Sequence, residues 1–332
     1  MDSIPQARTN EDTLAQVTPF PVLSRDISVV IVNYNSGSYL EKCIRSILTN
    51  AATSIKSLDI IVVDNASSDD SIVRLMSFFG SHPKVRIQHN IKNVGFAKAC
   101  NQGTKMASGD YIIYLNPDCE IHEDMFSSLL DTIQYCPKVG MVGAMLLNTD
   151  GTEQPGGRRA VPTPWRSFVR AFGLSKLQNR YPRLFSDYHL HSEAVPEEPI
   201  PVEAISGACM MVSRKALEDV GPMDEGYFMH CEDLDWCMRF RKKDWNILFV
   251  PDAKVTHVHG GCSQGQRVRV EWHKHKGMVR FYRQHFRHQY PSVMMWMVVA
   301  SVWFRYGAWA TAYGVSKPLK WFKKLFPTSK SH

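Results

Sequence analysis

The sequence predicts an α/β fold in which a mostly parallel sheet is flanked by helices. Four short apolar runs, rich in β-branched and aromatic residues, alternate with helical segments in the first third of the chain. Strands that alternate with helices in this way pair in parallel through right-handed crossovers. The chain has 332 residues, of which 44% are hydrophobic, so it is long enough to bury a large core.

Charge and cysteine usage narrow the class of protein. The formal net charge is +7, and the basic residues are concentrated in the C-terminal part. This distribution favours a phosphate-bearing ligand or an anionic membrane as the partner. We expect no nucleic-acid partner. The eight cysteines include no Cys-x-x-Cys pair, which argues against a zinc site or a disulfide framework and for a reducing compartment. No apolar signal core is visible, so we expect a cytoplasmic protein, with residues 1–25 as a flexible polar arm.

The first predicted strand ends in polar side chains. The β-branched run at residues 27–32 is typical of a strand buried on both faces. It stops at Asn33-Tyr34-Asn35, and a helix is expected at residues 38–49. The place where a glycine-rich phosphate loop would stand in a dinucleotide-binding protein therefore holds amide and phenol groups instead.

The second and third strands follow the same plan. Residues 59–63 form an apolar run that ends in Asp64 and Asn65, and residues 85–89 form the next strand. Polar side chains at the carboxyl ends of parallel strands could hydrogen-bond a base and a ribose. Capping of the following helix is the alternative, and it explains Asp64 and Asn65 less well than the serines after them.

A helix with a polar beginning precedes the fourth strand. Asn93 and Gly95 open this helix, Asn101 lies within it, and it runs to about residue 108. No G-x-x-x-x-G-K-[ST] motif occurs anywhere in the chain, so the P-loop interpretation loses its main evidence.

The fourth strand leads to a candidate metal ligand. Residues 111–115 are apolar, and Asn116-Pro117-Asp118 ends them, because proline cannot donate a ladder hydrogen bond. A carboxylate at this end of a buried strand suits Mg²⁺ or Mn²⁺. A surface turn is the simpler interpretation of this segment when it is taken alone.

The middle of the chain is less regular. A small-residue strand is expected at residues 139–147, and residues 202–212 return to strand character. Between them lie a loop that carries Arg158 and Arg159 and a mobile insertion at residues 166–201. These arginines either bind phosphate or are solvated on the loop, and the sequence favours neither interpretation over the other.

An acidic segment supplies the candidate base. Glu232, Asp233 and Asp235 stand at the start of a helix expected to end near residue 243, next to Trp236 and other apolar side chains. A helix N-terminus favours acidic residues through its dipole, which is the simpler account. Three carboxylates among apolar residues also suit a general base with a shifted pKa.

Two histidines provide a further metal-ligand candidate. After a strand at residues 246–250, His257 and His259 stand at alternate positions, so on a strand they share a face. A single histidine is usually structural. In a chain that already holds Asp118, the pair favours one metal ligand.

The C-terminal part predicts attachment to a membrane surface. Residues 271–289 are basic and aromatic, and residues 292–315 are apolar except for Arg305. Lysines interleaved with aromatic residues follow at 317–324. This mixture favours a helix that lies in the interface of an anionic leaflet over one that spans the bilayer. A helix docked on the core, or a contact between protomers, remains an alternative.

Together these segments resemble family 2 glycosyltransferases of the GT-A fold, and among them bacterial dTDP-rhamnosyltransferases that extend a polyprenyl-diphosphate-linked sugar. The resemblance covers residues 27–263. Any one motif would be weak, but six in order are specific. They are Val32-Asn33-Tyr34-Asn35, Val63-Asp64-Asn65-Ala66-Ser67, Asn93-x-Gly95-Phe96-Ala97, Leu115-Asn116-Pro117-Asp118, Phe228 through Trp236, and His257.

The resemblance implies roles for particular residues. Asp118 stands at the last position of the family's D-x-D metal motif, Asn116 replaces its first aspartate, and His257 would complete the metal site for Mg²⁺ or Mn²⁺ with the diphosphate oxygens. Asp233, the second residue of the Glu-Asp pair, would be the general base. The expected nucleotide-binding residues are Asn33, Tyr34, Asn35, Asp64, Asn65, Asn93, Gly95, Asn101 and Asn116, and the expected acceptor or orienting residues are Glu232, Asp235, Trp236 and Arg158.

The expected enzyme is an inverting, metal-dependent glycosyltransferase at the inner face of the cytoplasmic membrane. Its GT-A domain would cover residues 26–265, with a nucleotide half at 26–120, an acceptor half at 121–265, and a helical membrane-associating extension at 266–332. It would move a sugar, with dTDP-rhamnose the favoured donor, onto a glycan or lipid-linked acceptor of the cell envelope; an oligomer is possible. A nucleotidyltransferase, which would need a basic glycine-rich loop after the first strand, and a non-catalytic sugar-nucleotide or glycan-binding protein are the alternatives.

Overall fold

The computed structural model describes residues 26–51, 55–171, 174–177, 180–181, 190–191, 193–258, 260 and 267–325. The predicted N-terminal arm, His259 and part of the predicted insertion lie outside these described residues.

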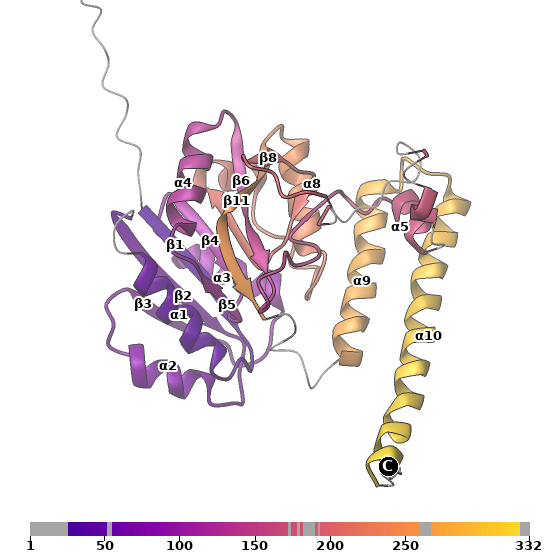
Figure 1. Cartoon of the computed structure of the whole chain (residues 1–332), viewed down its shortest axis with the longest axis horizontal. Coiled ribbons are helices and arrows are strands. Elements are labelled where there is room, and N and C mark those ends of the chain that lie inside the picture. The colour runs from indigo at the N-terminus through magenta and orange to yellow at the C-terminus, as the bar shows by residue number, and fades with distance from the viewer. Residues whose placement is uncertain are drawn as a thin grey trace, which may run out of the picture.

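The first half is the predicted alternation of parallel strands and helices. Its strands are β1 (Asp26–Asn33), β2 (Ser57–Asp64), β3 (Val85–His89) and β4 (Tyr111–Leu115), in the spatial order β3-β2-β1-β4 and all in parallel register. The helices between them are α1 (Tyr39–Asn50), α2 (Ser71–Phe79) and α3 (Phe96–Met106). Figure 1 shows these indigo and purple elements as one layered unit.

The central strands are buried on both faces. Val29 and Ile31 of β1 share a cluster with Leu40 of α1, whereas Val30 faces the cluster that contains α3. A Cβ atom on Gly103 would lie 2.4 Å from Cγ1 of Val30, so α3 packs this close to the sheet only because position 103 is glycine. The continuous apolar runs in the sequence are the result of this double burial.

The second half of the sheet is mixed in direction. After β4 the order continues with β10 (Cys209–Ser213), β6 (Val139–Leu147), β11 (Asn246–His257) and β5 (Cys119–Ile121), and β8 (Ile200–Pro201) pairs with β11. β10 runs antiparallel to both of its neighbours, and β6 and β11 are parallel. The helices of this half are α4 (Met125–Tyr135), α7 (Arg214–Val220) and α8 (Glu232–Lys242).

Two predicted strands have different limits in the structure. The expected strand at 202–212 is divided into β9 (Ala204–Ile205), which pairs with β7 (Arg158–Arg159), and β10, with a turn between them. The strand expected to end at Val250 continues as β11 to His257 through an irregularity between Val250 and Lys254. Pro251 lies in this irregular stretch, where its missing N–H does not interrupt the ladder.

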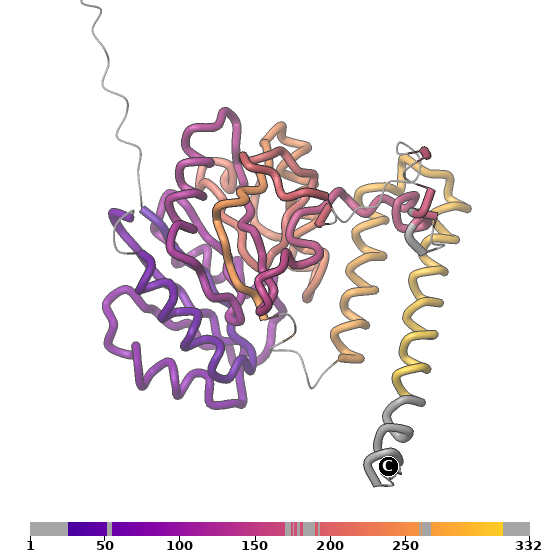
Figure 2. The backbone as a smooth tube through the Cα atoms, viewed as in Figure 1, coloured from indigo at the N-terminus to yellow at the C-terminus, as the bar shows by residue number. Residues whose placement is uncertain are grey.

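The C-terminal part forms a helical hairpin beside the sheet domain. α9 (Arg267–Phe286) and α10 (Ser292–Leu325) run antiparallel in orange and yellow, and the tube in Figure 2 shows the turn that joins them. Trp272 of α9 contacts Trp303 and Tyr306 of α10 through their rings. Among the helices of the described part of the chain, none combines the length and the apolar character that crossing a membrane requires.

A short helical segment occupies part of the predicted insertion. α5 (Pro164–Ala171) and the 3₁₀ turn η1 (Leu174–Leu177) lie here, so the described part of residues 166–201 contains regular structure. The hydroxyls of Ser167 and Tyr282 are 2.6 Å apart, which ties α5 to α9.

Candidate active site

The carboxyl ends of β1 and β2 are joined by their own polar side chains. Asn33 and Asp64 are partners in register, and Nδ2 of Asn33 donates to Oδ1 of Asp64 at 2.9 Å. The Ser67 hydroxyl donates to the same Asp64 oxygen at 2.6 Å, and Oδ1 of Asn35 accepts from the Ser68 N–H at 2.7 Å. The predicted nucleotide-binding residues after these two strands therefore lie together at one edge of the sheet, with Tyr34 half-buried among them.

The backbone at this edge adopts an uncommon conformation. Asn35 has a φ of 52° and Ala66 a φ of 62°, both in the left-handed region. A residue without glycine's freedom occupies this region at a cost, and such positions gather at ligand sites. The two turns thereby present a rim of backbone and polar groups beyond the strand ends.

The next predicted group holds the start of α3 in place. Nδ2 of Asn65 donates to the Gly95 carbonyl at 3.2 Å, and Oδ1 of Asn93 accepts from the Gly95 N–H at 2.9 Å. Gly95 has a φ of 94°, and a Cβ there would lie 2.6 Å from the Phe228 carbonyl oxygen. The segment that leads to the acidic helix is therefore pressed against this rim.

Asn101 has a different position from the one expected of a nucleotide ligand. Its Nδ2 donates to the Met223 carbonyl at 2.9 Å, and its Oδ1 accepts from the Met223 N–H at 3.0 Å. The side chain is buried, and both the nitrogen and the oxygen of its amide bind the loop before α8. Asn101 therefore holds α3 against that loop rather than facing the rim where a nucleotide is expected.

The candidate metal ligands meet because β11 pairs with β5. His257 is the register partner of Cys119, and this pairing brings Nε2 of His257 to 3.3 Å from Oδ1 of Asp118. Both side chains are buried. Nδ2 of Asn116 lies 3.5 Å from the same histidine nitrogen. Asn116, which stands where an aspartate was expected, therefore also lies at this site.

A neighbouring glutamine sets the form of the histidine. Nε2 of Gln154 donates to the His257 carbonyl at 3.2 Å and to Oδ1 of Asn148 at 3.1 Å, so its Oε1 faces Nδ1 of His257 at 2.6 Å. Nδ1 therefore carries a hydrogen, and Nε2 is the nitrogen that faces Asp118. In the neutral imidazole this arrangement leaves Nε2 to bind a divalent cation, while Nδ1 is held by an outer partner.

The donor set fits a hard or borderline cation. One oxygen of Asp118, the Cys119 sulfur and one nitrogen of His257 lie within 4.8 Å of one another. The Cys119 thiol donates to the Ala208 carbonyl at 3.5 Å, which leaves the carboxylate and the imidazole as the fitting pair. Oxygen and imidazole ligands suit Mn²⁺ and Mg²⁺.

The acidic residues begin α8 after a strained entry. His230 and Cys231 have φ values of 65° and 70°, two consecutive left-handed residues that are not glycine. This backbone turns the chain so that Glu232 and Asp233 are the first two residues of the helix. Such strain persists only where the surroundings hold it, as at active sites.

Asp233 is contacted from two other segments. Its Oδ2 forms an ion pair with Arg159 and accepts from the Gly207 N–H at 3.2 Å. Gly207 belongs to the turn whose next residue, Ala208, accepts from the Asn116 N–H at 2.9 Å. One turn between β9 and β10 therefore bridges the carboxylate of α8 and the metal-ligand segment.

Glu232 is buried beside Asp233. Burial, followed by the charge of Asp233, raises the pKa of Glu232 to about 8. Its Oε2 has no hydrogen-bond partner among the described residues. A carboxyl group in this setting holds its proton at neutral pH.

Three of the expected acceptor residues are used in packing. Arg158 is buried, donates to Glu153 at 2.8 Å and lies over the ring of Phe249. Successive side chains of β7 point to opposite sides, so the neighbouring Arg159 faces Asp233 instead. Trp236 is buried, and its Nε1 donates to the Gly221 carbonyl at 2.9 Å. These positions argue against direct contact of Arg158 or Trp236 with an acceptor.

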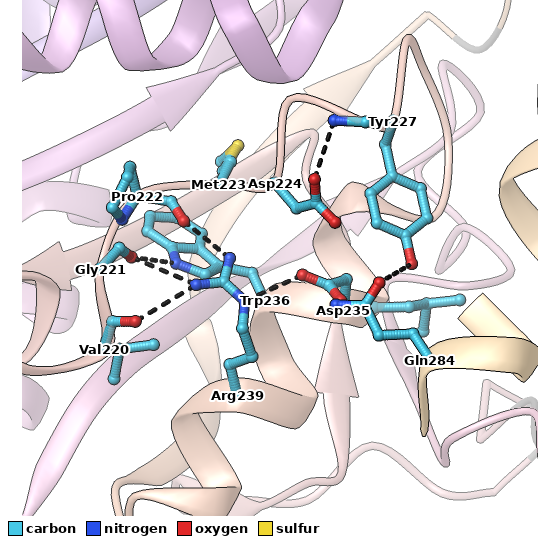
Figure 3. A network of polar contacts seen from close by, with 12 residues as sticks. Val220, Gly221, Pro222, Met223, Asp224, Tyr227, Asp235, Trp236, Arg239 and Gln284 are labelled. Atoms are coloured by element: carbon cyan, nitrogen blue, oxygen red, sulfur yellow. Dashed lines mark hydrogen bonds and ion pairs between the residues drawn. The ribbon is translucent and has the colours of Figure 1, made fainter. Parts of the chain in front are cut away.

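Asp235 is the third of these residues, and Figure 3 shows its surroundings. Its Oδ2 accepts from Nε of Arg239 at 2.9 Å, and Arg239 also donates to the Pro222 carbonyl at 2.8 Å. Its Oδ1 accepts from Nε2 of His285 at 2.8 Å, so the fully buried carboxylate joins α8 to α9. The expected orienting role does not fit a group enclosed in this way.

The site contains residues that were not among the site residues expected from the sequence. Arg159, Gln154 and Gly207 each touch a candidate catalytic or metal-binding side chain. The adjacent arginine pair was a signal for Arg159, but only the direction of each side chain on β7 distinguishes the two. The contacts of Gln154 and Gly207 depend on strands that are distant in the sequence.

Comparison with known proteins identifies the family. Residues 28–221 match the sequence profile of glycosyl transferase family 2. An N-acetylglucosaminyl-diphospho-decaprenol L-rhamnosyltransferase of Mycobacterium tuberculosis is 30% identical over 251 residues, which are 72% of this chain and 78% of that protein.

Solved structures show the same fold at low identity. GalNAc-T7 with UDP, GalNAc and Mn²⁺ matches with a TM-score of 0.58 and 18% identity, over 78% of this chain and 48% of that chain. The mannosyltransferase PcManGT from Pyrobaculum calidifontis, in complex with GDP-Man and Mn²⁺, matches with a TM-score of 0.55 and 16% identity. The match covers 91% of this chain and 78% of that chain. The nucleotidyltransferase and binding-protein alternatives are set aside, and the chain belongs to glycosyl transferase family 2 as an enzyme of the GT-A fold.

Proposed function

We propose that this glycosyltransferase moves a hexosyl group, L-rhamnose from dTDP-rhamnose, onto a polyprenyl-diphosphate-linked sugar of the cell envelope, with inversion at the anomeric carbon. The observation that carries the proposal is the turn at Gly207 and Ala208, which joins Asp233 to the Asp118 segment. The name of the Mycobacterium tuberculosis relative supports the choice of sugar and acceptor.

The nucleotide would bind at the rim beyond β1 and β2. Asn33, Asn35 and Asp64 offer amide and carboxylate groups there, and Gly95 lets the chain approach without a side chain in the way. Binding at the carboxyl ends of parallel strands is the general rule for open α/β sheets.

Asp118 and the Nε2 lone pair of His257 would hold Mg²⁺ or Mn²⁺ next to the donor diphosphate. Bound there, a divalent cation would neutralise the charge that develops on the leaving diphosphate. Gln154 would hold the hydrogen on Nδ1 and so leave Nε2 for the cation.

Asp233 would accept the proton of the acceptor hydroxyl as that oxygen attacks the anomeric carbon. The Gly207 N–H and Arg159 position its carboxylate from two sides. A single base suffices for inverting transfer, because no covalent intermediate forms and the leaving group is already a stabilised diphosphate.

Attachment to an anionic membrane would bring the enzyme to its lipid-linked acceptor. The outer face of α10 exposes Trp296 and Phe304 at 76% and 79%. Residues 272–332 contain eleven lysines and arginines and no acidic residue. Exposed aromatic residues beside basic ones are typical of a helix at the inner leaflet interface.

The deciding experiment incubates the full chain with polyprenyl-diphospho-N-acetylglucosamine and dTDP-rhamnose, UDP-glucose or GDP-mannose. We expect a product only with dTDP-rhamnose and a divalent cation, with inverted configuration by NMR. Asp118→Ala should abolish the metal-dependent turnover, whereas Asp252→Ala, an exposed carboxylate on β11, should not. Full turnover by EDTA-treated protein would contradict the metal role, and transfer from another donor would contradict the choice of rhamnose.

A further inference from the structure

A cavity that was not part of the expected site lies next to the acidic helix. It has a volume of about 580 Å³ and lies among α5, the later turns of α8 and the end of α9. Its lining includes Trp165, Arg166, Glu203, Arg241, Phe286 and Tyr290. Figure 1 shows α5 close to the end of α9 and the start of α10.

The cavity carries a surplus positive charge. Arg166 is neutralised by Glu203, to which its two terminal nitrogens donate at 2.6 and 3.2 Å. Burial raises the pKa of Glu203, but the hydrogen bonds from Arg166 and the Val161 N–H and the charges of Arg166 and Arg241 outweigh it, so the pKa is lowered and the carboxylate stays ionised between the two arginines. Arg241 contacts the Met238 sulfur at 3.8 Å and forms no ion pair within the described residues.

Apolar side chains make up the rest of the wall and its surroundings. Phe286 and Tyr290 line the cavity at the end of α9, and Trp165 lines it from α5. Trp165 stacks on Phe168 with ring centroids 5.6 Å apart, and both remain partly exposed, at 38% and 42%. A guanidinium group beside aromatic rings suits a ligand with an anionic head and a hydrocarbon tail.

Two elements connect this cavity to the candidate base. Arg159, the partner of Asp233, pairs in register with Ala204, the residue after Glu203. Arg241 is eight residues after Asp233 on α8, which corresponds to about 12 Å along the helix axis. The cavity is therefore within reach of a ligand whose other end occupies the active site.

We propose that this cavity binds the diphosphate and the first part of the hydrocarbon chain of the lipid-linked acceptor, with Arg241 as the phosphate-binding residue. The acceptor class rests on the proposed function, but the site is defined by its own charge and lining. The acceptor sugar would then extend along α8 toward Asp233, while the lipid leaves past Trp165 toward the exposed face of α10.

The test measures direct binding of farnesyl diphosphate to the full chain by calorimetry in EDTA, in the Asp118→Ala background, so that the metal site cannot hold the diphosphate. Farnesol and inorganic pyrophosphate serve as part-ligands. We expect farnesyl diphosphate to bind at least 10-fold more tightly than either. Arg241→Gln should weaken it by about 10-fold or more, since a charge-assisted hydrogen bond is lost.

Two matched variants separate charge from nonspecific effects. Arg241→Lys keeps a cation and should retain most of the binding, and Arg45→Gln removes a surface arginine of α1 that pairs with Glu41 and should change nothing. Equal affinity of Arg241→Gln and the parent protein, or no binding at all, would overturn the proposal. This assay needs no sugar transfer. The proposal for the cavity can therefore be contradicted while the proposed reaction is confirmed, and the proposed reaction can be contradicted while binding at the cavity is confirmed.

Discussion

At the scale of single residues, the carboxylates of α8 differ by what surrounds them. Asp233 touches Arg159 and the Gly207 N–H at the border of the site, whereas Asp235 is enclosed between Arg239 and His285. Two residues of separation on a helix turn the side chains by about 200°, so one faces the site and the other faces α9. We therefore propose Asp233 as the base, whereas Asp235 serves the packing of α8 against α9.

We expect Asp233→Asn to lower kcat by at least about 100-fold with little change in donor binding, because the amide cannot accept the proton of the acceptor. Asp235→Asn should instead destabilise the fold by about 1 to 3 kcal/mol, since the neutral amide removes the charge that pairs with Arg239 and cannot replace both carboxylate acceptors of Arg239 and His285. Steady-state kinetics and urea unfolding of both variants check this. Normal turnover by Asp233→Asn, or loss of activity by Asp235→Asn at unchanged stability, would reverse the two roles.

The raised pKa of Glu232 makes stability depend on pH. Its pKa is about 8 in the folded chain against 4.5 for an ordinary glutamate, so the folded state holds a proton that the unfolded state has released between these values. The favourable contribution is complete below pH 4.5 and is lost as the pH rises to about 8. Stability should therefore fall with pH over this window.

Glu232→Gln removes this dependence, since glutamine stays neutral. Melting temperatures between pH 5 and pH 9 should fall less steeply for Glu232→Gln than for the parent chain. Glu123→Gln, which changes an exposed carboxylate, should follow the parent. Identical slopes for all three proteins would mean that Glu232 is ionised in the folded state.

At the scale of elements, α10 has two unlike apolar faces. Met295 and Val302 are buried in the cluster that includes α9, while Trp296 and Phe304 point away from it. A helix that is apolar all round normally has a partner on every side. The hairpin with α9 supplies a partner for only one of these faces.

Trp296→Glu combined with Phe304→Glu tests the outer face without touching the buried one. Burial of two aromatic side chains is worth about 3 kcal/mol or more, so sedimentation with phosphatidylserine vesicles should weaken at least about 100-fold. Circular dichroism should show unchanged helix content. Unaltered vesicle binding by the double variant would remove the basis of the membrane proposal, and dissociation of an oligomer would assign the face to a second copy.

At the scale of the whole molecule, local patterns predicted the first half better than the second. The runs that form β1, β2 and β4 are apolar at nearly every position because both faces are buried, and this pattern is visible in the sequence. The insertion of β10 between β4 and β6 depends on pairing with residues about 100 positions away on β4 and about 70 positions away on β6, which no local pattern encodes.

The candidate site follows the same division. The polar residues at the ends of β1 and β2 meet because parallel neighbours end at one edge, which the alternation of strands and helices predicts. The choice between Arg158 and Arg159 depends on the direction of a two-residue strand, and the burial of Asp235 and Trp236 depends on how α9 packs. These are tertiary facts, so sequence reasoning assigned Arg158, Asp235 and Trp236 roles that the packing argues against.

The absence of acidic residues after Glu271 has a consequence for how the molecule meets a surface. Residues 272–332 hold more positive charge than the whole chain, so the remaining residues are net negative. The protein is thus an electric dipole with its positive end at the helical hairpin. In the field of an anionic bilayer it experiences a torque as well as an attraction, and it rotates toward one landing orientation before any side chain touches lipid.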